Sequence, residues 1–390
     1  MKVYKTAKGW AIFTYIVAPL LIALFSGLLV MPFIPGTELP LSIYWILTPV
    51  SLGMLALLIV GVLDTIKGRF VIDKDRVFVK TTLTNRQLML DEIKGYRVDN
   101  NYIFIESAVP GKKRIKISAY LGKTDEILEW LSSSYPDLNL QNMEQEEQEI
   151  LNNEELGWTY EQREEKLKKA RKTAKVLSWI GGLVGAWTLF WPSPYEYAIV
   201  ASVVVPVIAI IIAKTSGGLI RFDEKKNSAY PTVFWGIFSP SMAVSLRALL
   251  DFNIFNHDNV WLLAALISVT FIVVLIVGSK EFDFKSAKGF LAVAGISLTI
   301  FAYSYGTAIV INCLNDSSTP EIYSSKVLNK RISSGKSTSY YIELTPWGSQ
   351  KEADEVSVTK EFYEQINKGD AVSIYFMKGY MEIPWFIVTN

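Results

Sequence analysis

The stretch GWAIFTYIVAPLLIALFSGLLVMPF, residues 9–33, contains no charged side chain in 25 positions. A run of about twenty apolar residues is long enough for a helix to cross the roughly 30 Å hydrocarbon core of a membrane. Lys2, Lys5 and Lys8 precede the run, as basic residues do in a signal peptide. The run is longer than the apolar region of such a peptide, and no small-residue cleavage site follows it. It therefore predicts a retained membrane span.

Six more windows of this kind follow, and 50% of all residues are hydrophobic. These windows are centred in residues 41–63, 176–193, 197–213, 230–250, 260–278 and 289–312. The predicted fold class is a membrane α-helical bundle of about seven spans that carries two small soluble modules. The lipid bilayer is therefore an expected partner, and homo-oligomerisation is left open.

Basic residues alternate between the connecting segments. The N-terminus, residues 64–175, residues 214–228 and residues 279–288 are rich in Lys and Arg, whereas the intervening short loops lack them. Lys and Arg favour the cytoplasmic side of a membrane. The pattern predicts a bacterial cytoplasmic-membrane protein with a cytoplasmic N-terminus and an extracytoplasmic segment 314–390.

Composition limits the chemistry that the chain could perform. The formal net charge is +1, and the sequence has one His and one Cys. A charge near zero gives no basis for nucleic-acid binding. The single Cys313 excludes an intramolecular disulfide, and the single His257 excludes a His-cluster metal site. Paired catalytic carboxylates and a nucleophile with an adjacent base are not found either. We therefore expect no cofactor and no enzymatic activity.

Changes in composition divide the chain into five segments. They are two spans in residues 1–66, a cytoplasmic module in 67–138, a charged connector helix in 139–175, five spans in 176–313, and a β-rich extracytoplasmic module in 314–390. The connector is first acidic and then basic, which favours pairs four residues apart such as Glu164 with Lys168.

Residues 68–133 alternate apolar and polar side chains in short runs. Two strands are expected within 70–79, on either side of a turn at 73–75, and further strands near 88–93, 102–105 and 114–117. An amphipathic helix follows residue 124. Two spans followed by short antiparallel strands and one closing helix resemble the bacterial pleckstrin-homology-like (PH-like) domains of multi-spanning membrane proteins. The resemblance covers about a sixth of the chain. It implies a binding platform without catalytic chemistry.

A basic cluster lies in the last predicted hairpin of this module, at Lys112, Lys113, Arg114 and Lys116. Each basic residue near an anionic membrane surface contributes on the order of 1 kcal/mol to binding. The cluster is a candidate site for anionic lipid headgroups or for another membrane protein. The alternative is a hairpin tip whose charges are only solvated.

Residues 314–390 contain five strand-like runs and one short helix, which predicts a small β-barrel or OB-like module. Pro384 favours an edge position for the last strand. Gly-Lys-Ser-Thr at 335–338 has the letters that end a phosphate-binding P-loop. Lys330 replaces the first Gly of that motif, and a strand-like run follows it instead of a helix. We expect the tip of a β-hairpin rather than an ATP site.

Two further pairs are candidate interaction sites. Arg247 lies in the fifth predicted span, four residues before Asp251, and ionisable residues within spans are functional candidates. Arg221 and Asp223 lie in the mixed-charge loop 214–228. The leading hypothesis is an interaction scaffold or sensor that acts through its PH-like and β modules. The alternative is a transporter or transport-accessory protein with a polar pathway in spans five and seven.

Overall fold

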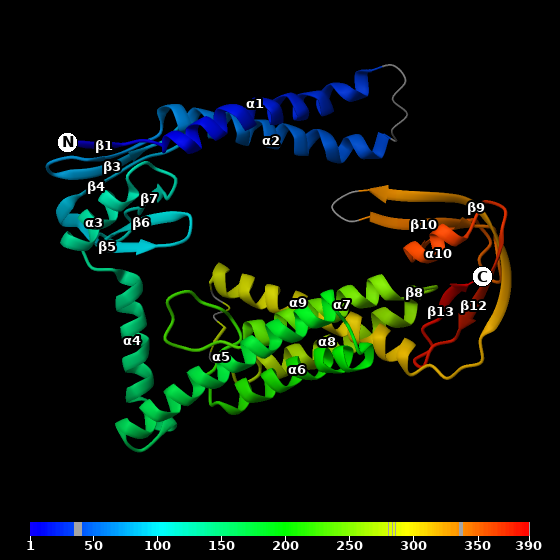
Figure 1. Ribbon diagram of the computed structural model, residues 1–390. Coiled ribbons are helices and arrows are strands. Elements are labelled where there is room, and N and C mark those ends of the chain that lie inside the picture. The colour runs from blue at the N-terminus through cyan, green and yellow to red at the C-terminus, as the bar shows by residue number, and fades with distance from the viewer. Residues whose placement is uncertain (35–40, 280, 283, 285, 335–337, 390) are drawn as a thin grey trace. The chain divides into compact units, whose positions relative to one another are not determined.

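The computed structural model describes residues 1–34, 41–279, 281–282, 284, 286–334 and 338–389. Its chain separates into two compact units, Met1–Gln145 and Glu146–Asn390 (Figure 1). We call them unit 1 and unit 2. Six of the described helices are long and apolar enough to cross a membrane, as expected of a multi-pass membrane protein. They are the helices at Lys8–Phe33, Ile43–Lys67, Tyr160–Phe190, Tyr195–Thr215, Asp258–Ile276 and Gly289–Leu314.

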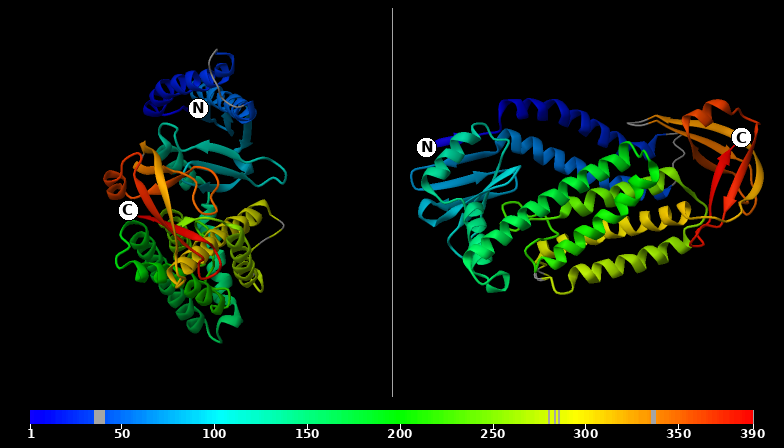
Figure 2. Two further views of the ribbon diagram at one scale, coloured as in Figure 1. Left: turned by 90° about the vertical axis from the view of Figure 1, so that its right-hand side faces the viewer. Right: turned by 60° about the horizontal axis from the view of Figure 1, so that its bottom comes forward.

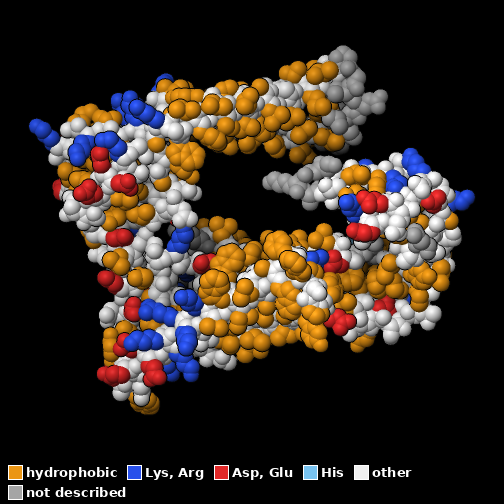
Figure 3. Space-filling view, viewed as in Figure 1, with side chains coloured by type: hydrophobic (Ala, Val, Ile, Leu, Met, Phe, Trp, Pro, Cys, Tyr) orange, Lys and Arg blue, Asp and Glu red, His pale blue; other side chains and the backbone are white. Residues whose placement is uncertain are grey.

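Unit 1 consists of a helical hairpin and two small antiparallel sheets. Its elements are β1 Lys2–Tyr4, α1 Lys8–Val30, α2 Leu41–Lys67, β2 Arg69–Ile72, β3 Arg76–Lys80, β4 Asn85–Met89, β5 Ile93–Val98, β6 Tyr102–Ser107, β7 Ile115–Ser118 and α3 Thr124–Ser134. One sheet has the order β1-β2-β3-β4 and the other the order β5-β6-β7. Hydrophobic side chains dominate the face of the α1–α2 hairpin that is visible in Figure 3, as lipid-facing helices require.

The core of unit 1 is apolar and lies between the two sheets and α3. Phe70 and Leu88 come from the first sheet, Ile105 from the second, and Ile127 and Leu131 from α3. Each of these five residues is fully buried. The alternation along the strands places their polar neighbours on the outer faces, because successive side chains of a strand point to opposite sides.

Strand β1 was not expected from the sequence. It precedes α1, yet it pairs with β2 after α2, with Lys2 opposite Ile72 and Tyr4 opposite Phe70. The segment between β1 and α1 also contacts the second sheet. The N–H of Ala7 donates to the carbonyl of Tyr120, just after β7, at 3.0 Å. Both ends of the hairpin are thereby fixed to the β-sheets. Three residues are too few to give a strand pattern, and their partner is distant in sequence.

Helix α4, Leu138–Asn152, runs across the boundary between the units, and α5, Tyr160–Phe190, follows a break. The connector is thus two helices rather than the expected one. Asn153 and Thr159 explain the break. The Asn153 side chain accepts the backbone N–H of Glu155 and caps the short 3₁₀ helix Glu154–Leu156, and the Thr159 side chain accepts the backbone N–H of Gln162 and caps α5. The expected pair forms within α5, where Lys168 Nζ lies 2.7 Å from Glu164.

Unit 2 contains a helical bundle and a β-sheet. The remaining elements are α6 Tyr195–Thr215, α7 Phe234–Asp251, β8 Asn253–Ile254, α8 Asp258–Ile276, α9 Ala287–Leu314, β9 Glu321–Ser334, β10 Thr338–Leu344, β11 Asp354–Val358, α10 Lys360–Gln365, β12 Ala371–Met377 and β13 Trp385–Thr389. Helices α5 to α9 lie side by side (Figure 2). The β-sheet follows α9 in the chain.

Six of the seven expected spans qualify by length and apolar composition, and helix α7 is the exception. It is a helix where the fifth span was expected, but it is not among the six that qualify by length and apolar composition. Its buried face consists largely of small or polar residues such as Gly236, Ser241 and Ser245. Since α5, α6 and α9 surround α7, its own composition need not match lipid.

Contacts along α5 and α7 show that the two helices run in the same direction. Ser178 Oγ donates to the carbonyl of Thr232 at 3.3 Å, just before α7 begins. Near the other end, Arg247 Nε donates to the carbonyl of Thr188 at 2.8 Å. Helix α7 therefore extends over the same depth of the bundle as the apolar half of α5.

The β module of unit 2 is one nearly closed six-stranded sheet of order β11-β10-β9-β12-β13-β8. Strand β13 lies inside this sheet and not at its edge, because Trp385 pairs with Ile254 of β8. Pro384 precedes β13 and so removes no hydrogen bond from it. Strands β9 and β10 form a hairpin as expected, whereas the Gly335 tip lies outside the described residues.

Candidate functional site

The four basic residues of the expected hairpin cluster do not form one site. The Lys112 ammonium pairs with Glu92, and this hydrogen bond lowers the pKa of the Glu92 carboxyl. Arg114 Nη1 lies 3.2 Å from Glu106 Oε1, and its guanidinium stacks 4.3 Å from the centre of the Phe104 ring. Lys113 is exposed. Three of the four side chains are thus paired or solvated. This arrangement favours the alternative stated above, in which the charges at the tip of the β6–β7 hairpin form no binding site.

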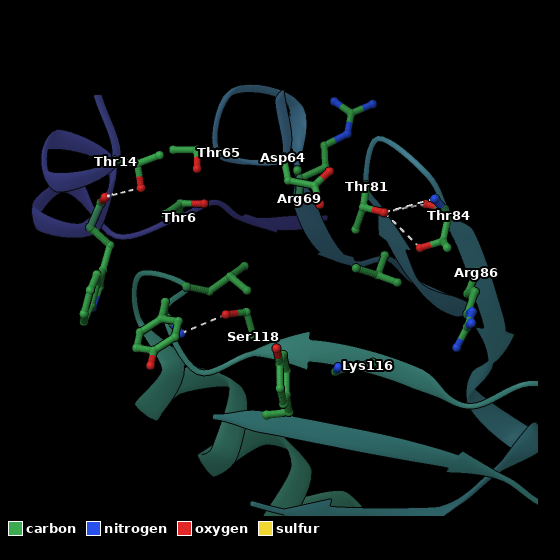
Figure 4. Close-up of a pocket in the computed structure, with 16 residues that line it drawn as sticks. Thr6, Thr14, Asp64, Thr65, Arg69, Thr81, Thr84, Arg86, Lys116 and Ser118 are labelled. Carbon is green, nitrogen blue, oxygen red and sulfur yellow. Dashed lines mark hydrogen bonds between the residues drawn. The ribbon is translucent and has the colours of Figure 1, made fainter. Parts of the chain in front are cut away.

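Lys116 differs from these three because it lines a cavity of about 500 Å³. We call this cavity the hairpin pocket, after the α1–α2 helical hairpin at whose end it lies. The neighbours of Lys116, Ile115 and Ile117, are buried in the core, so Lys116 faces outward. The Lys116 ammonium lies 3.5 Å from the centre of the Tyr102 ring, which holds it over the sheet. Figure 4 shows this pocket and the side chains around it.

The hairpin pocket lies where α1 begins and α2 ends. The α1 end supplies Trp10 and Thr14, and the α2 end supplies Asp64 and Thr65. Because α1 and α2 are candidate membrane spans, this end of the hairpin is where they would leave the bilayer. A molecule in the pocket would therefore be at the depth of the lipid headgroups.

The sheets supply the opposite side of the pocket. Arg86 from β4 and Lys116 from β7 lie on this side (Figure 4), and Arg86 Nη1 donates to the carbonyl of Arg114 at 3.0 Å. The β3–β4 turn closes the pocket beside them. There the Thr81 and Thr84 hydroxyls are hydrogen-bonded at 2.9 Å.

Charge in the pocket is predominantly positive. Arg69, Arg86 and Lys116 line it, and among the described lining residues Asp64 is the only acidic one. The Arg69 guanidinium points away from Ser118 and Lys116 (Figure 4). The Asp64 carboxylate accepts the backbone N–H of Thr82 through Oδ1 and so fixes the β3–β4 turn. The excess of cations favours an anionic ligand group.

Sequence reasoning identified Lys116 but missed the other pocket residues. Asp64 gave a usable signal, because a carboxylate at the end of an apolar run is uncommon. Arg86 and Trp10 gave none, since one lies in an ordinary polar strand and the other has the position of an interfacial aromatic. Their proximity depends on the pairing of β1 with β2.

The intramembrane candidate Arg247 is bound by the protein itself. Arg247 Nη1 lies 3.2 Å from Asp251 Oδ1, as the spacing predicted, and Nη2 donates to the carbonyl of Leu189 at 2.7 Å. The other carboxylate oxygen, Asp251 Oδ2, accepts a hydrogen bond from the hydroxyl of Tyr195 at 2.8 Å. A guanidinium at the last carbonyls of a helix stabilises that helix end. These contacts favour a structural role for Arg247 over substrate binding in transport.

Arg221 and Asp223 likewise have structural contacts. The Arg221 guanidinium lies 3.4 Å from the centre of the Tyr230 ring. The backbone N–H groups of Phe222 and Asp223 donate to the carboxylate of Glu281, which sequence reasoning did not identify. Burial raises the pKa of the Glu281 carboxyl, and the two backbone donors oppose this. The contacts join two loops at one end of the bundle.

A metal site has no support among the described residues, where no three His, Cys, Asp or Glu side chains gather as ligands. The hairpin pocket is therefore the candidate functional site, because it combines a cavity, a positive lining and a position at the end of two spans. Comparison of the chain with protein-family models, with curated proteins and with solved structures found no match in any of the three.

Proposed function

We propose that the protein is a non-enzymatic membrane scaffold or sensor whose unit 1 is a PH-like module that binds a lipid headgroup through its phosphate. The observation that carries the proposal is the positive pocket at the sheet end of the α1–α2 hairpin. The strands followed by the single closing helix α3 support the PH-like resemblance.

The attachment of the sheets to the hairpin supports a sensor role. Strand β1 joins the start of α1 to β2, which directly follows α2. A ligand that contacts both the hairpin and the sheets would stabilise one arrangement of these elements over others. In unit 2 the small β-barrel, which we also regard as OB-like, supplies a second surface for protein partners on the other face of the membrane.

Native mass spectrometry of the detergent-solubilised full chain tests this function. Phospholipids should remain bound, whereas a neutral diacyl glycolipid without phosphate should not. Lys116→Gln should weaken phospholipid retention about fivefold, because one basic contact near an anionic group contributes on the order of 1 kcal/mol.

Lys113→Gln is the matched control, since Lys113 has the same charge, lies three residues away and is exposed outside the pocket. It should leave retention unchanged. Equal losses in both variants, or equal retention of glycolipid and phospholipid by the wild-type chain, would contradict the proposed function.

A further inference from the structure

The two sides of the hairpin pocket differ in what they offer a ligand. On the sheet side, Arg86 and Lys116 are hydrogen-bond donors and carry positive charge. Neither side chain can accept a hydrogen bond in its charged form. This side is therefore suited to a phosphate, whose oxygens only accept when ionised.

The hairpin side offers acceptors. The Thr14 hydroxyl donates to the carbonyl of Trp10 and the Thr65 hydroxyl to the carbonyl of Gly61, both at 2.9 Å. Because each hydroxyl proton is used within its own helix, the oxygen lone pairs are what remain for the pocket. Asp64 adds a carboxylate to the same side.

The Asp64 carboxylate is only partly used by the protein. Its Oδ1 accepts the N–H of Thr82, and no donor to Oδ2 is found among the described residues. Figure 4 shows Asp64 on the hairpin side, beside Thr65 and across the pocket from Lys116. A carboxylate oxygen without a protein donor, in a mainly positive pocket, is available to a cationic ligand group.

Two aromatic rings meet at one edge of the pocket, Trp10 from α1 and Tyr120 from the segment after β7. The Trp10 and Tyr120 rings lie 4.4 Å apart, at the edge of the pocket where α1 begins. Both side chains are partly exposed, at 46% and 42%. The face of an indole or phenol ring attracts an ammonium group.

We propose that the hairpin pocket selects a zwitterionic phospholipid headgroup that carries a primary ammonium, of the phosphoethanolamine type. Arg86 and Lys116 bind the phosphate, and Asp64 with the Thr14 and Thr65 hydroxyls binds the ammonium. This inference rests on the proposed function and adds the class of headgroup. An ammonium with three N–H donors fits the acceptor side, whereas a quaternary choline has no N–H to donate.

Three synthetic lipids with identical acyl chains test the selectivity: one with an ethanolamine, one with a choline and one with a glycerol headgroup. Native mass spectrometry of the full chain should show the ethanolamine lipid retained about tenfold more tightly than the other two, the effect of one charge-assisted hydrogen bond. Equal retention of the ethanolamine and glycerol lipids would overturn the inference while leaving the proposed function intact. Failure to retain any phospholipid would overturn both.

Asp64→Asn tests the residue assignment, because the amide oxygen can still accept the Thr82 N–H while the charge is lost. The variant should lose the preference for ethanolamine over glycerol and keep its binding of the glycerol lipid. Asp75→Asn, at an exposed carboxylate in the β2–β3 turn, is the matched control and should keep the preference. An unchanged preference in Asp64→Asn would refute the assignment.

Thr65→Val provides a second test that does not depend on the turn. It removes the hydroxyl lone pairs with little change in side-chain volume, so retention of the ethanolamine lipid should fall and retention of the glycerol lipid should not. If both Asp64→Asn and Thr65→Val bind the three lipids as the wild-type chain does, the ammonium site does not exist.

Discussion

At the scale of single residues, Asn312 joins two parts of unit 2. Its side chain is fully buried at the end of α9. Asn312 Nδ2 donates to the carbonyl of Ile383 at 2.9 Å, and its Oδ1 accepts the N–H of Met381 at 2.8 Å. A single amide thus provides hydrogen-bond partners to two backbone groups of the loop before β13. The bundle and the β module are held together at this point.

Asn312→Ala should lower the stability of the β module by about 2 to 4 kcal/mol, because it leaves a buried carbonyl and a partly buried N–H without partners. Thermal unfolding followed by limited proteolysis of residues 314–390 would measure the effect. Asn315→Ala is the control, since the Asn315 amide donates only to the exposed end of its own helix. Similar stability of the two variants would contradict this role for Asn312.

At the scale of elements, close packing of α5 against α7 decides how the bundle is built. The spacing of Gly181 and Gly185 favours close helix contact. A Cβ added to Gly181 would lie 2.5 Å from Cα of Gly236 in α7, which real side chains do not tolerate. The structure confirms the close packing and identifies α7 as the partner helix. The spacing of the two glycines alone does not predict which helix packs against them.

Gly181→Leu should separate α5 from α7 and destabilise the solubilised chain by about 1 to 3 kcal/mol or more, the usual cost of overpacking. The midpoint of thermal unfolding in detergent would show the loss. Gly182→Leu is a close control, because no atom lies within 4 Å of a Cβ at this neighbouring position. A large effect at Gly182 and none at Gly181 would exclude the α5–α7 contact.

At the scale of the whole chain, the number of crossings decides on which side of the membrane each loop lies. Helix α7 has 18 residues, which corresponds to about 27 Å of helix and is close to the thickness of the hydrocarbon core. It also runs beside the apolar half of α5. We therefore expect α7 to cross the membrane although its own composition is less apolar than that of the six other spans.

Cysteines at Lys225, before α7, and at Glu352, in the β module, would test this crossing. Three helices separate them, so Lys225→Cys and Glu352→Cys should react with a membrane-impermeant thiol reagent from opposite sides. Intact cells should label Glu352→Cys, and Lys225→Cys should be labelled only after permeabilisation. The wild-type chain is the control, because its single cysteine, Cys313, is buried. Labelling of both variants from the same side would show that α7 does not cross.

The sequence by itself determined the features that depend on local patterns. Apolar runs of sufficient length predicted the spans because each backbone group in a membrane must be bonded within its own helix. Alternation predicted the strands of both β modules, and the four-residue spacing predicted the pair of Arg247 with Asp251. These are interactions between near neighbours, which a linear pattern contains.

Only the tertiary structure decided which distant residues meet. Strand β1 pairs across the whole helical hairpin, and β8, which lies between α7 and α8, pairs with β13, the last strand of unit 2. The hairpin pocket depends on the first of these pairings, which brings Trp10, Asp64 and Lys116 to one cavity. Three-residue and two-residue strands have no periodicity of their own, since their stability comes from the partner strand and from burial. The site is therefore a property of the fold and not of any motif.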